Sequence, residues 1–160
     1  MDRVVAIAIG SNLGDRAAHL AFARQALAGL LDNVRVSSVV ETAPIGVPDA
    51  QPPYLNAAAV GQSGRPARAL LAELLRIERM RGRERAFPNA ARTLDLDLIL
   101  AGDDVFEEPG LIVPHPRFRE RRFVLEPLAE IAPALRDPVS GLTVAELLRR
   151  LPPAHPAPRR

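Results

Sequence analysis

GRERAFPNAARTLDLDLIL spans residues 82–100 and places a run of arginines directly before two aspartates that are separated by one residue. Its second half, Thr93 to Leu100, alternates polar and apolar residues and therefore predicts a β-strand. Because alternate side chains of a strand share a face, Asp95 and Asp97 project together, roughly 6 to 7 Å apart along the strand. The four leucines are expected to face the core on the opposite side, at 94, 96, 98 and 100.

Two carboxylates this close together repel each other unless a cation lies between them. Mg²⁺ takes oxygen ligands and usually binds through one or two carboxylates together with the phosphates of a substrate. Arginines near such a metal complete a polyphosphate site, because the guanidinium group pairs with phosphate through two hydrogen bonds. The plainer alternatives are an edge strand whose outward charges deter aggregation, and arginines that form a solvated surface.

The composition limits the chemistry that the chain can perform. At 160 residues and 48% hydrophobic, it suits one globular domain, 1–160, with a core large enough to fold alone. There is no cysteine, which excludes disulfides, thiolate metal ligands and cysteine nucleophiles. All 21 basic residues are arginine, so lysine-dependent Walker P-loop and protein-kinase chemistry are excluded. The formal net charge of +2 is too small to argue for nucleic acid.

The sequence carries no targeting signal. No stretch approaches the roughly 20 apolar residues of a membrane span, and the N-terminal residues contain no cleavage-type site. We therefore expect a cytoplasmic protein with no membrane contact. The proline-rich tail, 152–160, is expected to be disordered.

Working outward from the strand at 93–100, hydrophobic periodicity predicts the remaining elements. The expected strands lie at 4–9, 34–41 and 55–62, and the expected helices at 15–31 and 66–81. The resulting βαββαβ order predicts an α+β fold with a ferredoxin-like core, an antiparallel sheet with both helices on one face. A C-terminal helical extension follows and ends in a helix at 143–151, with Thr143 and Glu146 as a capping box.

A second group of candidate residues suits a flat ligand. Segment 42–56, TAPIGVPDAQPPYLN, predicts a loop stiffened by prolines, and Asn56 can both donate and accept hydrogen bonds. Aromatic residues make up 4% of the chain, and Tyr54 and Phe123 are candidates to stack on a heterocycle; the alternative is two ordinary core residues. His115 lies between two prolines near several arginines, which favours a phosphate or ribose contact over a purely structural histidine.

Glu78 falls on the apolar stripe of the helix predicted at 66–81. A carboxylate at such a position needs a partner, because burying an unpaired charge is costly. We expect this partner to be an arginine of the following loop, so that Glu78 organises that loop.

Several motifs occur in an order that resembles a known family. They are GSNLGD at 10–15, TAPIG at 42–46, YLNAA at 54–58, RIERMRGRER at 76–85, RTLDLDLIL at 92–100, VPHPR at 113–117 and RFVLEPLAEIAP at 122–133. This set, over about residues 4–135, closely resembles 6-hydroxymethyl-7,8-dihydropterin pyrophosphokinase of folate biosynthesis. The resemblance implies transfer of the β,γ-pyrophosphoryl group of ATP to the hydroxymethyl oxygen of the pterin, which leaves AMP and a pterin diphosphate.

The resemblance also implies roles for individual residues. Asp95 and Asp97 would hold two Mg²⁺ ions, and Arg83 and Arg92 match the catalytic arginines. The ATP contacts would be Arg85, Arg92, Leu98, His115 and Arg121. The pterin pocket would consist of Thr42, Ile45, Tyr54, Asn56 and Phe123. The expected partners are these small molecules alone, without nucleic acid, and the expected state is a monomer.

The chain departs from the family's pattern at three places. Some members carry an Arg-Trp pair where this chain has AFPNAA, 86–91, one residue shorter, so that either Phe87 substitutes for the Trp or no residue does. Those members often have an aromatic residue after the histidine, where this chain has Pro116. They also often have a glutamine near the end of the second helix, where this chain has Leu75. The resemblance therefore implies an altered lid and adenine pocket beside an intact phosphate site.

Two other readings compete with this one. A nucleotidyltransferase also couples a Gly-Ser loop to strand aspartates, but in that class the loop lies shortly before the aspartates, whereas Ser11 lies far before Asp95. An RNA-binding module would place aromatic residues on its central strands for base stacking. The strands predicted here contain valine, isoleucine, leucine and alanine instead.

Overall fold

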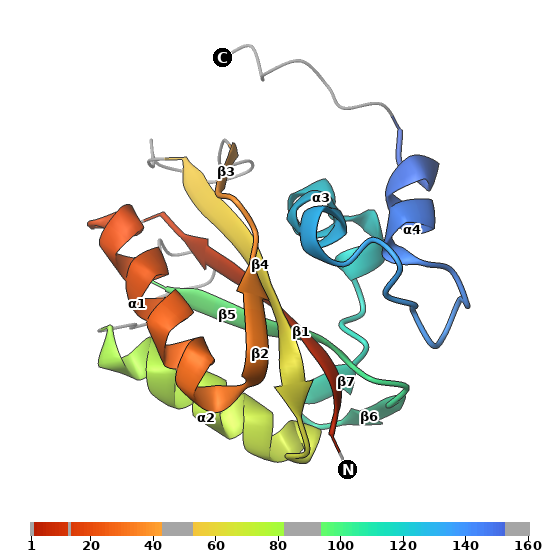
Figure 1. The fold of residues 1–160 in the computed structure, drawn as a ribbon, viewed down its shortest axis with the longest axis horizontal. Helices are drawn as coiled ribbons and strands as arrows, with labels where there is room; N and C mark the ends of the chain where they lie inside the picture. The colour runs from red at the N-terminus through yellow and green to blue at the C-terminus, as the bar shows by residue number, and fades with distance from the viewer. Residues whose placement is uncertain (1, 13, 43–52, 82–93, 153–160) are drawn as a thin grey trace.

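The computed structural model describes residues 2–12, 14–42, 53–81 and 94–152, and its first elements follow the predicted order (Figure 1). The first half contains β1 (Arg3–Ser11), α1 (Arg16–Leu30), β2 (Asp32–Val36), β3 (Val40–Thr42) and β4 (Tyr54–Ser63). The second half contains α2 (Ala67–Met80), β5 (Asp95–Ala101), β6 (Phe106–Glu108), β7 (Leu111–Val113), the short 3₁₀ helix η1 (Phe118–Glu120), α3 (Arg122–Ile131) and α4 (Val144–Arg150). The predicted α+β class is confirmed.

The main sheet has the order β2-β4-β1-β5, and β3 pairs with β4 as well. All of these pairs are antiparallel. Helix α1 connects β1 to β2 with β4 between them, and α2 connects β4 to β5 with β1 between them. This split connection is the arrangement expected of a ferredoxin-like core. It places β1 and β4 in the centre of the sheet and β5 at one end of its order.

Helices α1 and α2 cover one face of the sheet (Figure 1). Helix α1 begins after Asp15, whose side chain accepts a hydrogen bond from the N–H of Ala18 at 3.1 Å and so acts as an N-cap. The helix residues buried against this face are Leu20, Ala23, Leu27, Leu70, Leu74 and Ile77. Because each fully buried leucine contributes roughly 1.5 to 3 kcal/mol, this layer holds both helices firmly on the sheet.

Helices α3 and α4 lie on the other face, where they form the predicted C-terminal extension (Figure 1). The residues of this second core include Ala6, Ala58, Val60, Phe118, Val124, Leu125, Leu128, Val144 and Leu147. The capping box of α4 is confirmed, because Thr143 Oγ1 accepts from the N–H of Glu146 and the Glu146 side chain accepts from the N–H of Thr143. The extension therefore covers part of the face that α1 and α2 leave open.

The single strand predicted at 34–41 is wrong, because the chain forms two short strands, β2 and β3, there. Ser37 interrupts the ladder: its Oγ accepts the N–H of Ala58 at 2.9 Å, while its own N–H donates to the carbonyl of Ala58 at 2.9 Å. A side-chain hydroxyl thus replaces a backbone acceptor at this point. Val39, expected to be part of the strand, is 51% exposed.

The prediction that four leucines face the same core is wrong for the last of them. Leu98 pairs with Ile7 whereas Leu100 pairs with Ala6, so Ile99 is an extra residue on β5. Such a β-bulge shifts the alternation of side chains by one. Leu94, Leu96 and Leu98 pack with α1 and α2, but Leu100 packs with α3 and α4 on the opposite face.

The β6-β7 hairpin was not anticipated from the sequence. Its strands contain three residues each, which is too short for a periodic pattern. The turn between them contains Pro109 and Gly110, and Gly110 has φ +78°, a conformation that favours glycine. This Pro-Gly pair was the available signal. Arg68 of α2 ties the hairpin down through Glu108 Oε1 at 3.0 Å.

Candidate active site

The register of the central strands brings three predicted residues onto one face of the sheet. Gly10 of β1 lies between Asn56 of β4 and Asp95 of β5, and in the next row Ala8 lies between Ala58 and Asp97. Directly opposed residues of antiparallel strands point to the same face. Asn56, Asp95 and Asp97 therefore share the face opposite α1 and α2. The alternation that predicted a common face for the two aspartates is confirmed by this register.

Thr42 and Tyr54 extend the same face beyond Asn56. They oppose each other across β3 and β4, two residues along from the pair of Val40 and Asn56. Asn56 is 6% exposed, and its Nδ2 donates to Thr42 Oγ1 at 2.8 Å. This bond fixes the orientation of the amide, so that its edge is presented in one defined way. The half-buried Tyr54 is held near this amide by its place in β4.

Gly10 forms the floor of this arrangement and was missed as a site residue at the sequence level. A Cβ placed on Gly10 would lie 3.5 Å from Asn56 Oδ1 and 3.8 Å from Tyr54 Cδ1. These are ordinary contact distances, so the fold itself has room for an alanine. The glycine therefore leaves room for about one methyl group beside the Asn56 amide and the Tyr54 ring. The available signal was a glycine at the end of a strand otherwise composed of valine, alanine and isoleucine.

The aspartate pair lies on β5 with both side chains half-buried. Between them, Leu96 turns its side chain to the opposite core and donates its N–H to Glu78 Oε2 at 2.6 Å. Glu78 is 2% exposed on α2, as its place on the apolar stripe predicted. The described contact of Glu78 is therefore with the strand that carries the aspartates, while the arginine loop expected as its partner lies outside the described residues.

The carboxylate pair fits Mg²⁺ by the chemistry of its donors. Among residues 2–12, 14–42, 53–81 and 94–152, no group of three or more His, Cys, Asp or Glu side chains gathers in the manner of an all-protein metal site. Two carboxylates are the number that Mg²⁺ commonly uses when substrate phosphates and water complete its coordination. The arrangement thus suits an ion that arrives together with a phosphate-bearing substrate.

His115 begins the turn between β7 and α3 and is held by two backbone contacts. Its N–H donates to the carbonyl of Ile99 at 2.9 Å, and its Nδ1 accepts from the N–H of Arg117 at 3.2 Å. Since Nδ1 is an acceptor, the neutral ring carries its proton on Nε2, which is the atom left to donate to a ligand. The turn therefore presents an N–H donor without adding a charge.

The electrostatics of His115 connect it to the other site residues. Burial lowers the pKa of His115 below its usual value, and the nearby charge of Arg121 lowers it further, whereas Asp95 acts in the opposite direction. The effect of Asp95 indicates that this aspartate and the histidine lie within electrostatic range of each other. His115 is consequently neutral near pH 7, in the form that donates through Nε2.

Phe123 lies at the start of α3 and is 39% exposed, so it is not the ordinary core residue that the plainer reading assumed. The guanidinium of Arg121 stands 5.6 Å from the centroid of its ring. Helix α3 packs against β4, the strand of Tyr54 and Asn56. The structure thus places Arg121 and Phe123 on an element that covers the same face of the sheet as the aspartates.

The remaining predicted residues divide into two groups. Arg83, Arg85, Arg92 and Ile45 lie outside the described residues, as does Phe87. Leu98 is described, and its side chain is 5% exposed within the core formed with α1 and α2. Because that core is on the face opposite Asp97, a contact between Leu98 and ATP has to use the backbone of β5.

Arg16, at the first turn of α1, is a further residue that sequence reasoning missed. Its Nη1 donates to the carbonyl of Pro53 at 2.6 Å, next to Tyr54. This bond ties the residue before β4 to the first turn of α1. No sequence signal marked it, because the contact joins residues far apart in the chain.

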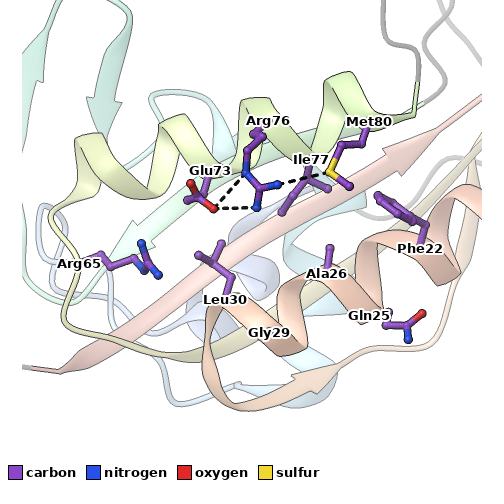
Figure 2. A pocket seen from close by; sticks show the side chains of 10 residues that line it. All are labelled: Phe22, Gln25, Ala26, Gly29, Leu30, Arg65, Glu73, Arg76, Ile77 and Met80. Carbon is purple, nitrogen blue, oxygen red and sulfur yellow. Dashed lines mark hydrogen bonds and ion pairs between the residues drawn. The ribbon is translucent and has the colours of Figure 1, made fainter.

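A groove of about 490 Å³ lies between α1 and α2, but it is separate from this site (Figure 2). Figure 2 shows Phe22 and Ala26 of α1 facing Ile77 and Met80 of α2 across it. Ile77 belongs to the core on the helix side of the sheet. The sheet therefore separates this groove from Asp95 and its neighbours.

Carboxylates that suit a metal ion and basic groups that suit phosphate, gathered on one face of an α+β sheet, define a phosphate-transferring enzyme. Residues 6–133 match the profile of the family described as 7,8-dihydro-6-hydroxymethylpterin-pyrophosphokinase. The chain is 40% identical over 147 residues to the 2-amino-4-hydroxy-6-hydroxymethyldihydropteridine pyrophosphokinase of Synechocystis sp., a match that covers 91% of this chain and 74% of that protein. The chain belongs to this pyrophosphokinase family of folate biosynthesis.

Two further comparisons agree with this assignment. The chain is 43% identical over 136 residues to the protein of the same name from Bacillus subtilis, covering 82% of this chain and 79% of that one. The fold is shared with the crystal structure of Plasmodium falciparum HPPK-DHPS A437G with STZ-DHP, at a TM-score of 0.69 and 12% identity. That match covers 94% of this chain but 45% of the other, so this chain spans less than half of the Plasmodium protein. At this identity the likeness concerns the fold alone.

Proposed function

We propose that the chain transfers the β,γ-pyrophosphoryl group of ATP to the hydroxyl of 6-hydroxymethyl-7,8-dihydropterin, producing AMP and the pterin diphosphate. The observation that carries this proposal is the row Asn56, Gly10 and Asp95 across three neighbouring strands. With about 4.8 Å between strands, the backbones of the outer two residues are roughly 10 Å apart. A bicyclic ring and its hydroxymethyl arm span such a distance, with the ring at Asn56 and the hydroxyl near the aspartates.

The pterin end of the site rests on hydrogen bonding and stacking. Asn56, oriented by Thr42, would pair with the edge of the ring that both donates and accepts hydrogen bonds. Tyr54 and Phe123 would stack on the two faces of the ring, which is the contact that aromatic side chains favour. We assign Ile45 to this pocket from the family resemblance.

The metal end of the site rests on Asp95 and Asp97, which would hold two Mg²⁺ ions. When bound, these ions would neutralise the negative charge of the phosphates and align the hydroxyl with the transferred group. The two aspartates would fix the positions of the ions. They can do so because the apolar side chains of β5 pack into both cores. Their shared face, set by the register of β5 against β1, places the two carboxylates next to each other.

The nucleotide would be bound mainly through its phosphates. His115 would donate from Nε2, and Arg121, at the start of α3, would add a positive charge on the same side. Arg83, Arg85 and Arg92 would approach from the segment between α2 and β5, and Arg83 and Arg92 would stabilise the charge that develops during transfer. Leu98 would contribute backbone contacts.

Product analysis tests this proposal. The protein is mixed with Mg-ATP and 6-hydroxymethyl-7,8-dihydropterin, and both products are identified by chromatography and mass. We expect AMP and a pterin heavier by two phosphoryl groups, with both lost in Asp97→Ala. Asp103→Ala is the matched control, because Asp103 is an exposed aspartate just after the same strand. ADP or free pyrophosphate as the product would refute the proposed transfer and would point to another phosphate-transfer reaction.

We further propose that the enzyme acts as a cytoplasmic monomer on these small molecules without nucleic acid. None of the helices in the described part of the chain is long and apolar enough to cross a membrane. Sedimentation equilibrium of the purified protein tests the oligomeric state, and a mass near 17.3 kDa is expected. Twice that mass would contradict the monomer.

A further inference from the structure

The turn at 114–121 carries two of the residues proposed to bind ATP, and its position depends on what holds it. One end is held by the bond from the His115 N–H to Ile99 of β5. Within the turn, the N–H of Arg121 donates to the carbonyl of Phe118 at 3.2 Å. Phe118 is completely buried in the core with α3 and α4. The turn is therefore held by hydrogen bonds at both ends and by a buried side chain in the middle. A change in the position of its middle residues should also shift His115 and Arg121.

Arg119, in the middle of this turn, binds a buried carboxylate on the C-terminal extension. Its Nε donates to Asp137 Oδ2 at 2.5 Å and its Nη2 donates to Asp137 Oδ1 at 2.9 Å. The carboxylate of Asp137 is 0% exposed, and the guanidinium lies 4.8 Å from the centroid of the Phe118 ring. A charged pair with two parallel hydrogen bonds fixes orientation as well as distance.

Asp137 is itself held in place by a tight loop. Its carboxylate also accepts from Ser140 Oγ at 2.6 Å and from the N–H of Val139 at 3.0 Å. The N–H of Gly141 donates to the carbonyl of Asp137 at 2.8 Å, with Gly141 at φ +76°. Burial alone raises the pKa of Asp137, but the hydrogen bonds from Arg119 and Ser140 outweigh it and lower the pKa to about 2. The loop therefore fixes the position of the carboxylate, and Arg119 together with Ser140 keeps it charged.

This loop lies beyond residue 133, where the match to the family profile ends. We propose that Arg119 and Asp137 are positioning residues: the pair holds the turn at 114–121 in the orientation in which His115 and Arg121 meet the phosphates of ATP. The inference rests on the proposed function of that turn. In this role neither residue contacts the substrate. The C-terminal extension contributes to nucleotide binding indirectly, because Asp137 orients the turn that carries His115 and Arg121.

The test separates positioning from general stability by the kinetic constants it affects. Asp137→Asn keeps the shape of the side chain but removes its charge, and Arg119→Met removes the guanidinium while keeping an apolar stem over Phe118. We expect each variant to raise the KM for Mg-ATP about tenfold and to change the KM for the pterin less than about twofold, since a misplaced binding group affects its own ligand. The double variant should resemble the single ones, because the two residues act as a unit.

Arg136→Met is the matched control. Arg136 donates to the carbonyl of Gly141, so this change loosens the same loop without touching the turn. A rise in the KM for Mg-ATP in this control equal to that of Asp137→Asn would overturn the proposal, and so would variants that lose thermal stability while both KM values stay unchanged. If Asp137→Asn does not fold, Arg119→Lys, which keeps one charged contact, is expected to show a smaller rise in the same constant.

A readout independent of turnover distinguishes this inference from the proposed function. The imidazole resonances of His115 are compared in the wild type, Asp137→Asn and Arg136→Met by NMR without substrate. We expect a shift in Asp137→Asn alone, because only that variant releases the turn. An unchanged His115 signal would overturn the positioning role even if the wild type forms AMP and the pterin diphosphate. If the His115 signal shifts in Asp137→Asn but the wild type forms other products, the positioning role of Arg119 and Asp137 stands and only the proposed pyrophosphoryl transfer is refuted.

Discussion

At the scale of single residues, Gly10 has the sharpest expected effect on specificity. A methyl group added there meets protein atoms at 3.5 Å or more, so the fold should accept it. It would occupy the space between Asn56 and Tyr54 in which we place the pterin. For Gly10→Ala we expect the KM for the pterin to rise about tenfold with little change in the KM for ATP, because only one ligand loses its contact surface.

The control for this prediction is Gly61, where an added Cβ would clash with protein atoms instead of lying at an ordinary contact distance. A Cβ on Gly61 would lie 2.8 Å from Leu31 Cβ and 3.0 Å from the carbonyl oxygen of Asp32. We therefore expect Gly61→Ala to lower the free energy of unfolding by about 1 to 3 kcal/mol while leaving both KM values near the wild type. Urea denaturation measures the first and steady-state kinetics the second. Equal loss of stability in both variants would contradict the argument.

The protonation of His115 gives a pH dependence with a defined sign. Its folded pKa is below the unfolded value of about 6.5, so the unfolded state binds more protons between these two values. Stability should therefore rise with pH across that window, and this contribution should be lost as pH falls through the window. His19 also has a lowered pKa from burial and from Arg81, and so contributes in the same direction.

Comparison with His115→Gln isolates the contribution of His115 from that of His19. The difference in unfolding free energy between wild type and variant, measured in urea from pH 5 to 8, should slope upward with pH only in the window below about 6.5. NMR titration of the His115 ring should give a midpoint below that value. A midpoint above it would contradict the desolvated environment described for this residue.

At the scale of elements, Glu78 adds a hydrogen bond to the apolar packing between α2 and the strand of the aspartates. Replacing it with leucine leaves the N–H of Leu96 without its described acceptor, and a buried donor left unsatisfied costs about 1 to 3 kcal/mol. We expect Glu78→Leu to lower the free energy of unfolding by that amount and to speed hydrogen exchange at the Leu96 amide. Exchange at this amide that stays at the wild-type rate would show that the bond does not hold the strand.

Glu73→Leu is the control on the same helix. Glu73 pairs with Arg76 at 2.9 Å, but the arginine side chain is 55% exposed, and exposed ion pairs contribute about 0 to 1 kcal/mol. The variant should therefore lose little stability and retain activity. A loss equal to that of Glu78→Leu would indicate that any acidic residue on α2 is equally important.

At the scale of the whole molecule, the predicted metal belongs to the reaction and not to the fold. Two carboxylates on one strand, with no larger acidic or histidine cluster among the described residues, do not make a structural metal site. We expect EDTA to abolish pyrophosphoryl transfer and Mg²⁺ to restore it, while the melting temperature without substrate changes by less than about 2 °C, which for this size is no more than about 1 kcal/mol. A large drop in melting temperature would contradict this separation.

The sequence was sufficient for the order of the core elements and for the common face of Asp95 and Asp97, because both follow from local periodicity. It was not sufficient for the split between β2 and β3, which depends on the hydroxyl of Ser37 binding a strand far along the chain. The bulge at Ile99 was hidden for a related reason, since Ile99 and Leu100 are both apolar and give no sign of a change of face. Contacts between distant segments, such as Arg119 with Asp137, leave no local pattern.

Strand β5 carries both aspartates and, two residues beyond them, the carbonyl of Ile99 that binds the backbone of His115. The metal-binding end and the phosphate-binding turn are therefore attached to the same short strand, which is itself paired with β1. The interval between them cannot lengthen or shorten unless that pairing breaks. We therefore expect the metal-binding end and the phosphate-binding turn to move as one unit and to keep a constant separation when substrates bind.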